Sequence, residues 1–261
     1  MKPNMKKQLL PYLMAAVLVM PIAAGAQTVR LRIVTPYEKA VIQTDTASAI
    51  EKYAGVGLQR AIQLMTGTLL NIIHKTQTVT DAKIIIGNTK TNSRVQQAAA
   101  VLQLNGGGDE KIAVKKVGYI LYLAGNTSRG ALYATYTFLQ DYLGARWYWP
   151  DSTGEFLPKR DSIVLDQPLF ISHTPHLEVR SIAVTGFRTA ETENWMELTD
   201  VWMARNRLNW VSDRTATAQS VIPKRRAKGF FSRRAGHNVA VPNELITAAR
   251  LQGADSVLAA W

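Results

Sequence analysis

Two tryptophans in an aromatic run have the spacing of residues that could bind a sugar ring. Trp147 and Trp149 lie in the segment Arg146-Trp-Tyr-Trp149, whose composition is typical of a β-strand. Side chains at i and i+2 of a strand point to the same face, and indole rings offer a flat apolar surface on which a sugar can stack. Packing between two parts of the protein is the alternative interpretation of the pair, and the sequence leaves both open.

The acidic residues and histidines predict neither a hydrolytic centre nor a metal site. Hydrolysis of a glycosidic bond requires two carboxyl groups that flank the bond. Asp213 follows a predicted strand without a matching acid, and His237 has no second ligand at metal-binding spacing. The chain has no cysteine, so we assign no catalytic residue, no metal and no cofactor. The remaining acids near a predicted helix are typical of a solvated face: Glu191, Glu193, Glu197 and Asp200.

Residues 118–150, which end in the aromatic run, predict a strand, a tight turn, an amphipathic helix and a second strand. Ser128 is a suitable helix cap, and Gly144 is a suitable C-terminal stop. The apolar face of this helix repeats at helical spacing through Leu132, Tyr136, Leu139 and Leu143.

The residues before this segment predict an alternation of strands and helices. Strands are expected at 29–34, 69–73, 83–87 and 110–114, and helices, the first capped by Thr46, over 47–65 and 93–102. The pattern favours an α+β fold, with helices packed on one mixed sheet.

A different pattern begins near residue 171. A strand over 177–184, a helix over 193–204 and a strand over 207–211 are the opening of a (β/α) barrel, which needs eight such units. We therefore expect an incomplete barrel and a chain that is a fragment or whose end is read out of register, and a small appended helical subdomain is the alternative. The expected organisation is a signal peptide (1–26), an α+β accessory domain (27–170), a barrel start (171–220) and a basic, irregular tail able to form one helix (221–261).

Residues 82–166 resemble the N-terminal domain of family 67 α-glucuronidases and the related second domain of family 20 hexosaminidases. The matching segments are Ile84-Ile-Ile-Gly-Asn88, Gly118-Tyr-Ile120, Gly125-Asn-Thr-Ser-Arg-Gly130 and Leu143-Gly-Ala-Arg-Trp-Tyr148. Because the domain is not itself catalytic in those families, the resemblance implies a non-catalytic domain of a secreted glycoside hydrolase that acts on a polysaccharide or oligosaccharide. A carbohydrate-binding or docking module without enzymatic activity is the alternative.

The resemblance extends to one substrate-binding residue. Pro175-His-Leu-Glu-Val-Arg180 is similar to the entry of the family 20 barrel, where an arginine binds substrate hydroxyls, which implies that role for Arg180. Its five fixed donors suit vicinal hydroxyls or a uronate carboxylate. Ser181 and Thr185 depart from the family pattern, so a structural salt bridge is an equally good interpretation of this arginine.

The charge distribution points to export and away from nucleic acid. Lys2, Lys6 and Lys7 precede an apolar stretch over 9–23 and the small residues 24–26, the pattern of a cleaved signal peptide. We expect a secreted or periplasmic protein without a membrane anchor once the signal is removed. The formal charge of +12 comes largely from this segment and from a basic cluster over 224–234, so we expect no nucleic-acid partner. Nothing in the sequence indicates an oligomeric state.

Overall fold

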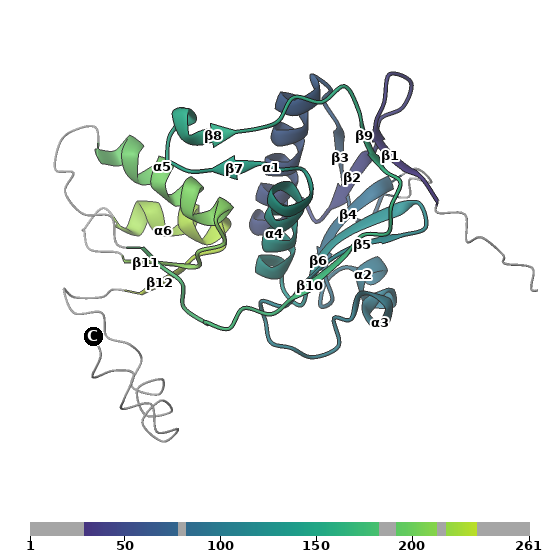
Figure 1. Ribbon diagram of the computed structural model, residues 1–261. Coiled ribbons are helices and arrows are strands. Elements are labelled where there is room, and N and C mark those ends of the chain that lie inside the picture. Colours follow the sequence, from purple (N-terminus) through teal and green to yellow (C-terminus); the bar gives the residue numbers. More distant parts are fainter. Residues whose placement is uncertain (1–28, 78–81, 183–191, 213–217, 234–261) are drawn as a thin grey trace, which may run out of the picture.

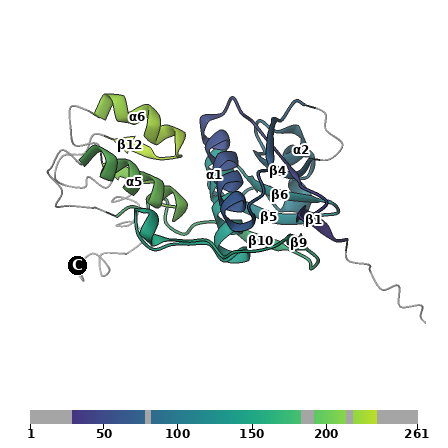
Figure 2. The ribbon, with the colours of Figure 1, turned by 90° about the horizontal axis from the view of Figure 1, so that it is seen from above.

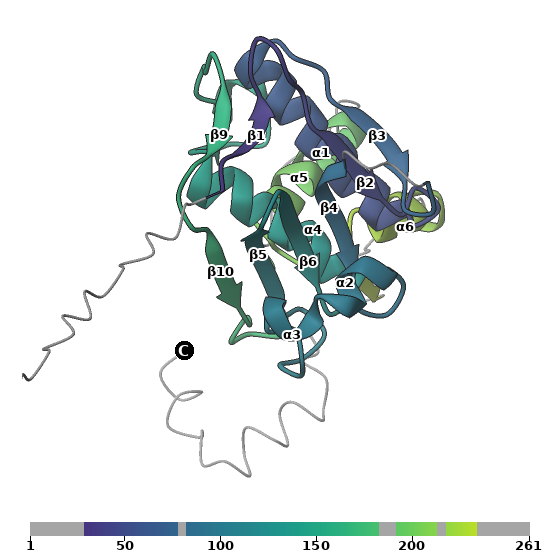
Figure 3. The same cartoon turned by 90° about the vertical axis from the view of Figure 1, so that its right-hand side faces the viewer.

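The computed structural model describes residues 29–77, 82–182, 192–212 and 218–233, arranged around a six-stranded mixed sheet (Figure 1). The strand order is β10-β5-β6-β4-β2-β3, which can be followed from one side of Figure 3 to the other. Neighbours from β6 to β3 are parallel, while β5 runs antiparallel to both β6 and β10. The strands are β2 (Val41–Thr44), β3 (Asn71–His74), β4 (Ala82–Asn88), β5 (Ile112–Val117), β6 (Ile120–Gly125) and β10 (Phe170–His173). The predicted mixed sheet of an α+β fold is thus confirmed.

Helices cover both faces of the sheet because its central strands are apolar on both sides. Ile84 and Ile86 of β4 belong to the large core under α1 (Ala49–Thr66) and α4 (Ser128–Thr137). Ile85 points to the opposite face, into a smaller core closed by α2 (Ser93–Gln97) and α3 (Ala99–Leu102). The close fit of α4 on β6 depends on glycine, since a Cβ on Gly125 would lie 2.4 Å from the carbonyl carbon of Gly130.

The helix ends differ slightly from the predicted ones. Ser48, not Thr46, caps α1, and its hydroxyl accepts a bond from the Glu51 amide. Thr127, one residue before the predicted cap Ser128, caps α4, and Gly144 with φ of 78° follows the π-helical turn η1 (Phe138–Tyr142).

Two short antiparallel pairs flank the sheet. β1 (Leu31–Val34) pairs with β9 (Ile163–Leu165), and β7 (Arg146–Trp147) pairs with β8 (Glu155–Phe156) after the 3-10 turn η2 (Ser152–Gly154).

A second, smaller unit packs on the outer side of α1 and α4. It consists of α5 (Thr192–Arg205), β11 (Trp210–Ser212), α6 (Ala218–Ala227) and β12 (Phe231–Arg233), with β11 and β12 paired in parallel. Figure 2 shows α1 between the sheet and the helices α5 and α6. Met203, Ala204 and Phe230 form its small core, against which Tyr53 of α1 packs.

The second unit corrects several predictions for residues after 171. The helix expected over 193–204 is present as α5, but Leu177–Ile182 forms no strand. Leu177 is 67% exposed and Ile182 50% exposed, so the alternating apolar residues have no surface on which to pack. Regular structure in α6 and β12 also replaces the first part of the irregular tail expected from residue 221. The expected helix over 243–258 lies outside the described residues.

Candidate functional site

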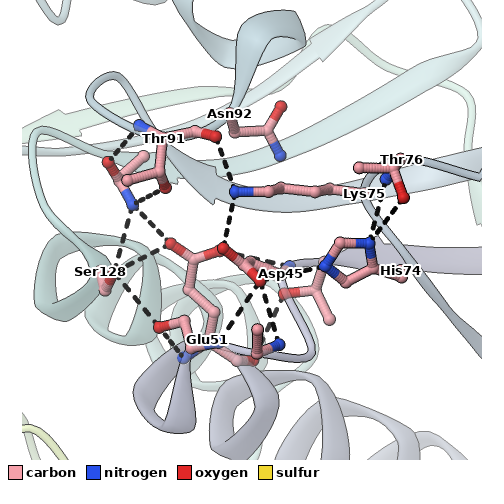
Figure 4. A network of polar contacts seen from close by, with 12 residues as sticks. Asp45, Glu51, His74, Lys75, Thr76, Thr91, Asn92 and Ser128 are labelled. Atoms are coloured by element: carbon pink, nitrogen blue, oxygen red, sulfur yellow. Dashed lines mark hydrogen bonds and ion pairs between the residues drawn. The ribbon is translucent and has the colours of Figure 1, made fainter.

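The carboxyl ends of the parallel strands carry a network of polar side chains (Figure 4). In open α/β sheets ligands bind at this edge. Here Asp45 follows β2, His74 ends β3, Asn88 ends β4, and the first turns of α1 and α4 add Glu51 and Ser128.

Glu51 is the most deeply buried acid of this network, with a side chain fully excluded from solvent. One of its oxygens accepts bonds from Asn88 Nδ2 at 2.5 Å and Ser128 Oγ at 2.9 Å. Burial raises the pKa of Glu51 although these two hydrogen bonds oppose the shift.

Asp45, beside Glu51, has Lys75 and His74 as its neighbours instead. It accepts a bond of 2.6 Å from Lys75 Nζ and lies 3.2 Å from His74 Nε2. Partial burial on its own would raise the pKa of Asp45, but the bonds from Lys75 and from the Ala47 amide outweigh it and lower the pKa. Because Asp45, Glu51, His74 and Lys75 all bond to other groups of the chain, the protein's own residues occupy the edge where a ligand would bind.

No residue of this network was among the predicted site residues. Ser48 followed three residues later by Glu51, ahead of an apolar run, has the form of a capping box. That pattern was the available signal for a buried glutamate at this position.

A second polar cluster, at Glu110, lies where the sheet unit meets the second unit. Arg180 Nη2 donates to one carboxylate oxygen at 2.5 Å, while Arg129 Nη1 at 3.2 Å and Asn209 Nδ2 at 2.9 Å donate to the other. The side chains of Glu110 and Arg180 are only 12% and 17% exposed. Both oxygens of Glu110 therefore join the two units.

Arg180 itself is engaged in structural contacts. Besides Glu110, its guanidinium donates to the carbonyls of Leu177 at 2.6 Å and Arg207 at 3.0 Å. The carbonyl of Arg180 accepts bonds from the amides of Asn209 and Trp210, which lead into β11. These contacts correspond to the structural alternative considered for this arginine, and its predicted role in substrate binding stays a prediction.

The aromatic run is divided between buried and exposed positions. Trp147 is 5% exposed, and its indole donates to Glu155 at 2.9 Å. Its carbonyl accepts a bond of 2.8 Å from Trp202 Nε1 of α5. Trp149 lies beyond the end of β7 and is 59% exposed. The two indoles therefore do not share one surface, which corrects the expectation that both face the same way.

Glu155 is the centre of a third cluster, and like Glu110 it accepts bonds from residues of both units. It pairs with Arg60 of α1 and Arg205 of α5, each at 2.8 Å, and accepts the Trp147 indole bond. Burial by itself would raise the pKa of Glu155, but the bonds from Arg60 and Trp147 and the charge of Arg205 lower it.

Among the acids expected on a solvated face, Asp200 is an exception. It is 4% exposed and accepts a bond of 2.9 Å from Arg225 Nε of α6, while Glu197 is 56% exposed at its side chain. Arg225 and Lys228 of the basic cluster thus contact acids of α5, whereas Lys224 and Arg226 are exposed. Glu191, Asp213 and His237 lie outside the described residues.

A pocket lies beside the Glu110 cluster. Its volume is about 590 Å³, and it lies where β10, α4 and the ends of the second unit meet. Its walls include Tyr133, Asp141, His173, His176, Leu177 and Arg207. Arg180 also lines it, whereas Trp147 and Trp149 do not. Across residues 29–77, 82–182, 192–212 and 218–233, no helix has the length and apolar character needed to cross a membrane.

Comparison with known proteins gives a likeness in fold. No family model and no curated protein matches the chain. A solved GH115 4-O-methyl-α-glucuronidase, BtGH115A, with specificity for decorated arabinogalactans, is similar over 79% of this chain and 29% of its own, with 15% identity and a TM-score of 0.56. The GH20 β-N-acetylhexosaminidase of Streptomyces coelicolor A3(2) matches 71% of this chain and 32% of its own, with 15% identity and a TM-score of 0.46. This chain thus spans less than a third of either protein. It shares an α+β fold with part of the first of the two.

Replacing Glu51 by glutamine tests its buried, proton-binding state. Because its pKa is raised on folding, its contribution to stability is complete below its unfolded pKa of about 4.5 and is lost as the pH rises through the folded pKa. Glutamine cannot ionise and keeps an oxygen for Asn88 and Ser128. We expect the free energy of unfolding of Glu51→Gln, relative to wild type, to improve from pH 4.5 upward, by at most about 1.4 kcal/mol per pH unit.

Urea unfolding at several pH values between 4 and 7 measures this difference, with the exposed Glu178→Gln as a control. A difference for Glu51→Gln that does not change with pH would contradict the assignment.

Replacing Glu110 by alanine tests the junction of the two units. The variant leaves Arg180 and Arg129 without their shared carboxylate in a largely buried place. We expect the free energy of unfolding to fall by about 3 kcal/mol. The matched control is Asp109→Ala, at a neighbouring side chain that is 76% exposed, with an expected change below about 0.5 kcal/mol. Equal urea midpoints for the two variants would show that the cluster does not join the units.

Proposed function

We propose that this chain is the non-catalytic accessory region of a secreted carbohydrate-active hydrolase, with a polysaccharide or oligosaccharide as the partner of the whole protein. The proposal rests on the hydrogen bonds that both carboxylate oxygens of Glu110 accept. A glycosidase needs two carboxyl groups free to reach the bond that is cleaved, yet both oxygens of this carboxylate are engaged by Arg129, Arg180 and Asn209. Among the described residues that line the pocket, Asp141 is the other acid.

In this proposal the sheet unit is a scaffold for the second unit. Glu110 and Glu155 contact α5 and its neighbours at two places, and the Trp147 carbonyl adds a third. The fold likeness to part of an α-glucuronidase supports the same interpretation. Export through the signal pattern over 1–26, which lies outside the described residues, belongs to the proposal as well.

A second candidate function, a carbohydrate-binding module, is favoured by one surface. Three large aromatic side chains are exposed on or beside the β7–β8 hairpin: Tyr148 at 68%, Trp149 at 59% and Phe156 at 54%. Trp149 packs closely against Gly154. A Cβ at residue 154 would lie 2.2 Å from the Trp149 Cβ, so a larger residue would displace the tryptophan. Exposed aromatic faces are suited to sugar rings.

The accessory role predicts that the purified chain does not hydrolyse glycosides. We expect no release of product from aryl glycosides or from glucuronoxylan oligomers above that of a buffer control, with an active α-glucuronidase as the positive control. Turnover that copurifies with the chain and disappears in Asp141→Asn would overturn the proposal.

The binding-module alternative predicts that Trp149 contributes to retention on insoluble polysaccharide. Trp149→Ala would weaken retention about two- to tenfold, the value of one stacking contact, without changing the melting temperature. Tyr119→Ala is the matched control, because Tyr119 is 67% exposed in a different hairpin. Equal retention of wild type and both variants in a pull-down would exclude this surface.

A further inference from the structure

The loop between α3 and β5 carries an asparagine followed by three glycines, Asn105-Gly-Gly-Gly108. The glycines have positive φ, of 79°, 86° and 82°, and they and Asn105 are exposed. A Cβ built at residue 106 would meet no atom within 4 Å, so the space around Gly106 is open. The peptide between Asn105 and Gly106 is therefore exposed to solvent and free of crowding by a β-carbon.

This peptide also makes no hydrogen bond within the described part of the chain. The carbonyl and side-chain amide of Asn105 and the N–H of Gly106 all lack a partner there. On one side Leu104 is buried, and its amide donates to a carbonyl of α3. On the other side Asn126 Nδ2 donates to the carbonyls of Gly106 and Gly108, at 2.8 Å and 2.7 Å. The peptide between these two anchored points can rotate without breaking a hydrogen bond.

An asparagine in this setting can react with its own backbone. The nitrogen of Gly106 gives its proton to water or hydroxide and forms a bond to Asn105 Cγ, a reaction that is fast only where the two atoms can approach closely. The bond from Cγ to the side-chain nitrogen breaks, and this nitrogen takes a proton from water and leaves as ammonia. Water then adds across either C–N bond of the resulting cyclic imide and gives aspartate or isoaspartate, without any change of oxidation state.

A cation lies over the same loop. A Cβ built on Gly107 would lie 2.4 Å from Lys111 Cδ and 3.2 Å from Lys111 Nζ, so this side chain crosses the residue that follows Gly106. The ammonium has no ion-pair partner in the described part of the chain. A fixed positive charge stabilises negative charge that develops during a reaction. Lys111 is thus placed to favour loss of the amide proton and closure of the ring.

The fold protects the other asparagines whose side chains are described. Asn92 precedes a small residue, Ser93, but it is 3% exposed and its Oδ1 accepts bonds from two amides of α2. Asn71 is exposed, but the next residue is the β-branched Ile72, which pairs with β2. Hydrogen bonds hold the side-chain amides of the rest: Asn88, Asn126, Asn206 and Asn209.

We propose that Asn105 is a site of spontaneous covalent modification, at which attack by Gly106, favoured by Lys111, converts the asparagine to aspartate and isoaspartate. The conversion adds a negative charge to the loop whose carbonyls hold Asn126, the residue before the cap of α4. Isoaspartate also adds a backbone carbon immediately before Gly106. The reaction needs only water, and it is independent of the proposed function.

Peptide mapping by mass spectrometry tests this inference on the full folded chain, incubated in mildly alkaline buffer made with heavy-oxygen water. We expect labelled aspartate and isoaspartate at residue 105, formed at least tenfold faster than acid at any other described asparagine. Lys111→Gln would slow the conversion two- to fivefold with an unchanged melting temperature. Lys90→Gln is the matched control, because Lys90 pairs with Asp109 of the same loop at 3.2 Å, and it would convert at the wild-type rate. In urea all three proteins would convert equally, since Lys111 is then no longer held over the loop.

A synthetic peptide with the sequence of residues 102–111 supplies the reference rate. Conversion of the folded chain at least tenfold more slowly than the peptide would overturn the inference, because the fold would then protect Asn105 as well. Faster formation of labelled acid at Asn71 or Asn92 would overturn it too. Equal rates for folded wild type and Lys111→Gln would contradict the part assigned to the lysine.

Discussion

The carboxylate of Glu110 lies where three parts of the chain meet: the start of α4, the segment around Arg180 and the entry to β11. Its oxygens accept bonds from Arg129, Arg180 and Asn209. Burying a charged group is costly unless it is paired and hydrogen-bonded. The two units must therefore keep the relative position in which these bonds to Glu110 form. Glu110 therefore constrains the junction in addition to the apolar contact, which includes Tyr53 packed on the small core around Met203 and Phe230.

Most of the buried carboxylates in the described residues are engaged in structural contacts. Glu51 and Asp45 fill the carboxyl edge of the sheet, and Glu110 and Glu155 are engaged in joining the units. Carboxylates that might have served chemistry are thus used for architecture. The pocket beside Glu110 differs, because Asp141, His173 and His176 in its wall are exposed to solvent.

The sequence predicts the parts of this structure that depend on local pattern. The apolar run over 83–87, the spacing in α4 and the glycines around residue 125 led to the mixed sheet and its helical layer. Positions decided by distant partners were not predictable. Asp200 is buried because Arg225 lies opposite. Residues 177–182 form no strand because no neighbour covers them. Trp147 and Trp149 lie on different surfaces because β7 ends after Trp147. The pocket residues come from four separate segments, which no spacing rule connects.

The most direct test of this account is a double-mutant cycle between Glu110 and Arg180, using the free energies of unfolding of wild type, Glu110→Ala, Arg180→Ala and the double variant. Groups that act as one cluster have coupling energies of about 0.5–3 kcal/mol, and we expect a value above about 1 kcal/mol. Additive effects of the two substitutions would contradict the claim that this cluster joins the two units.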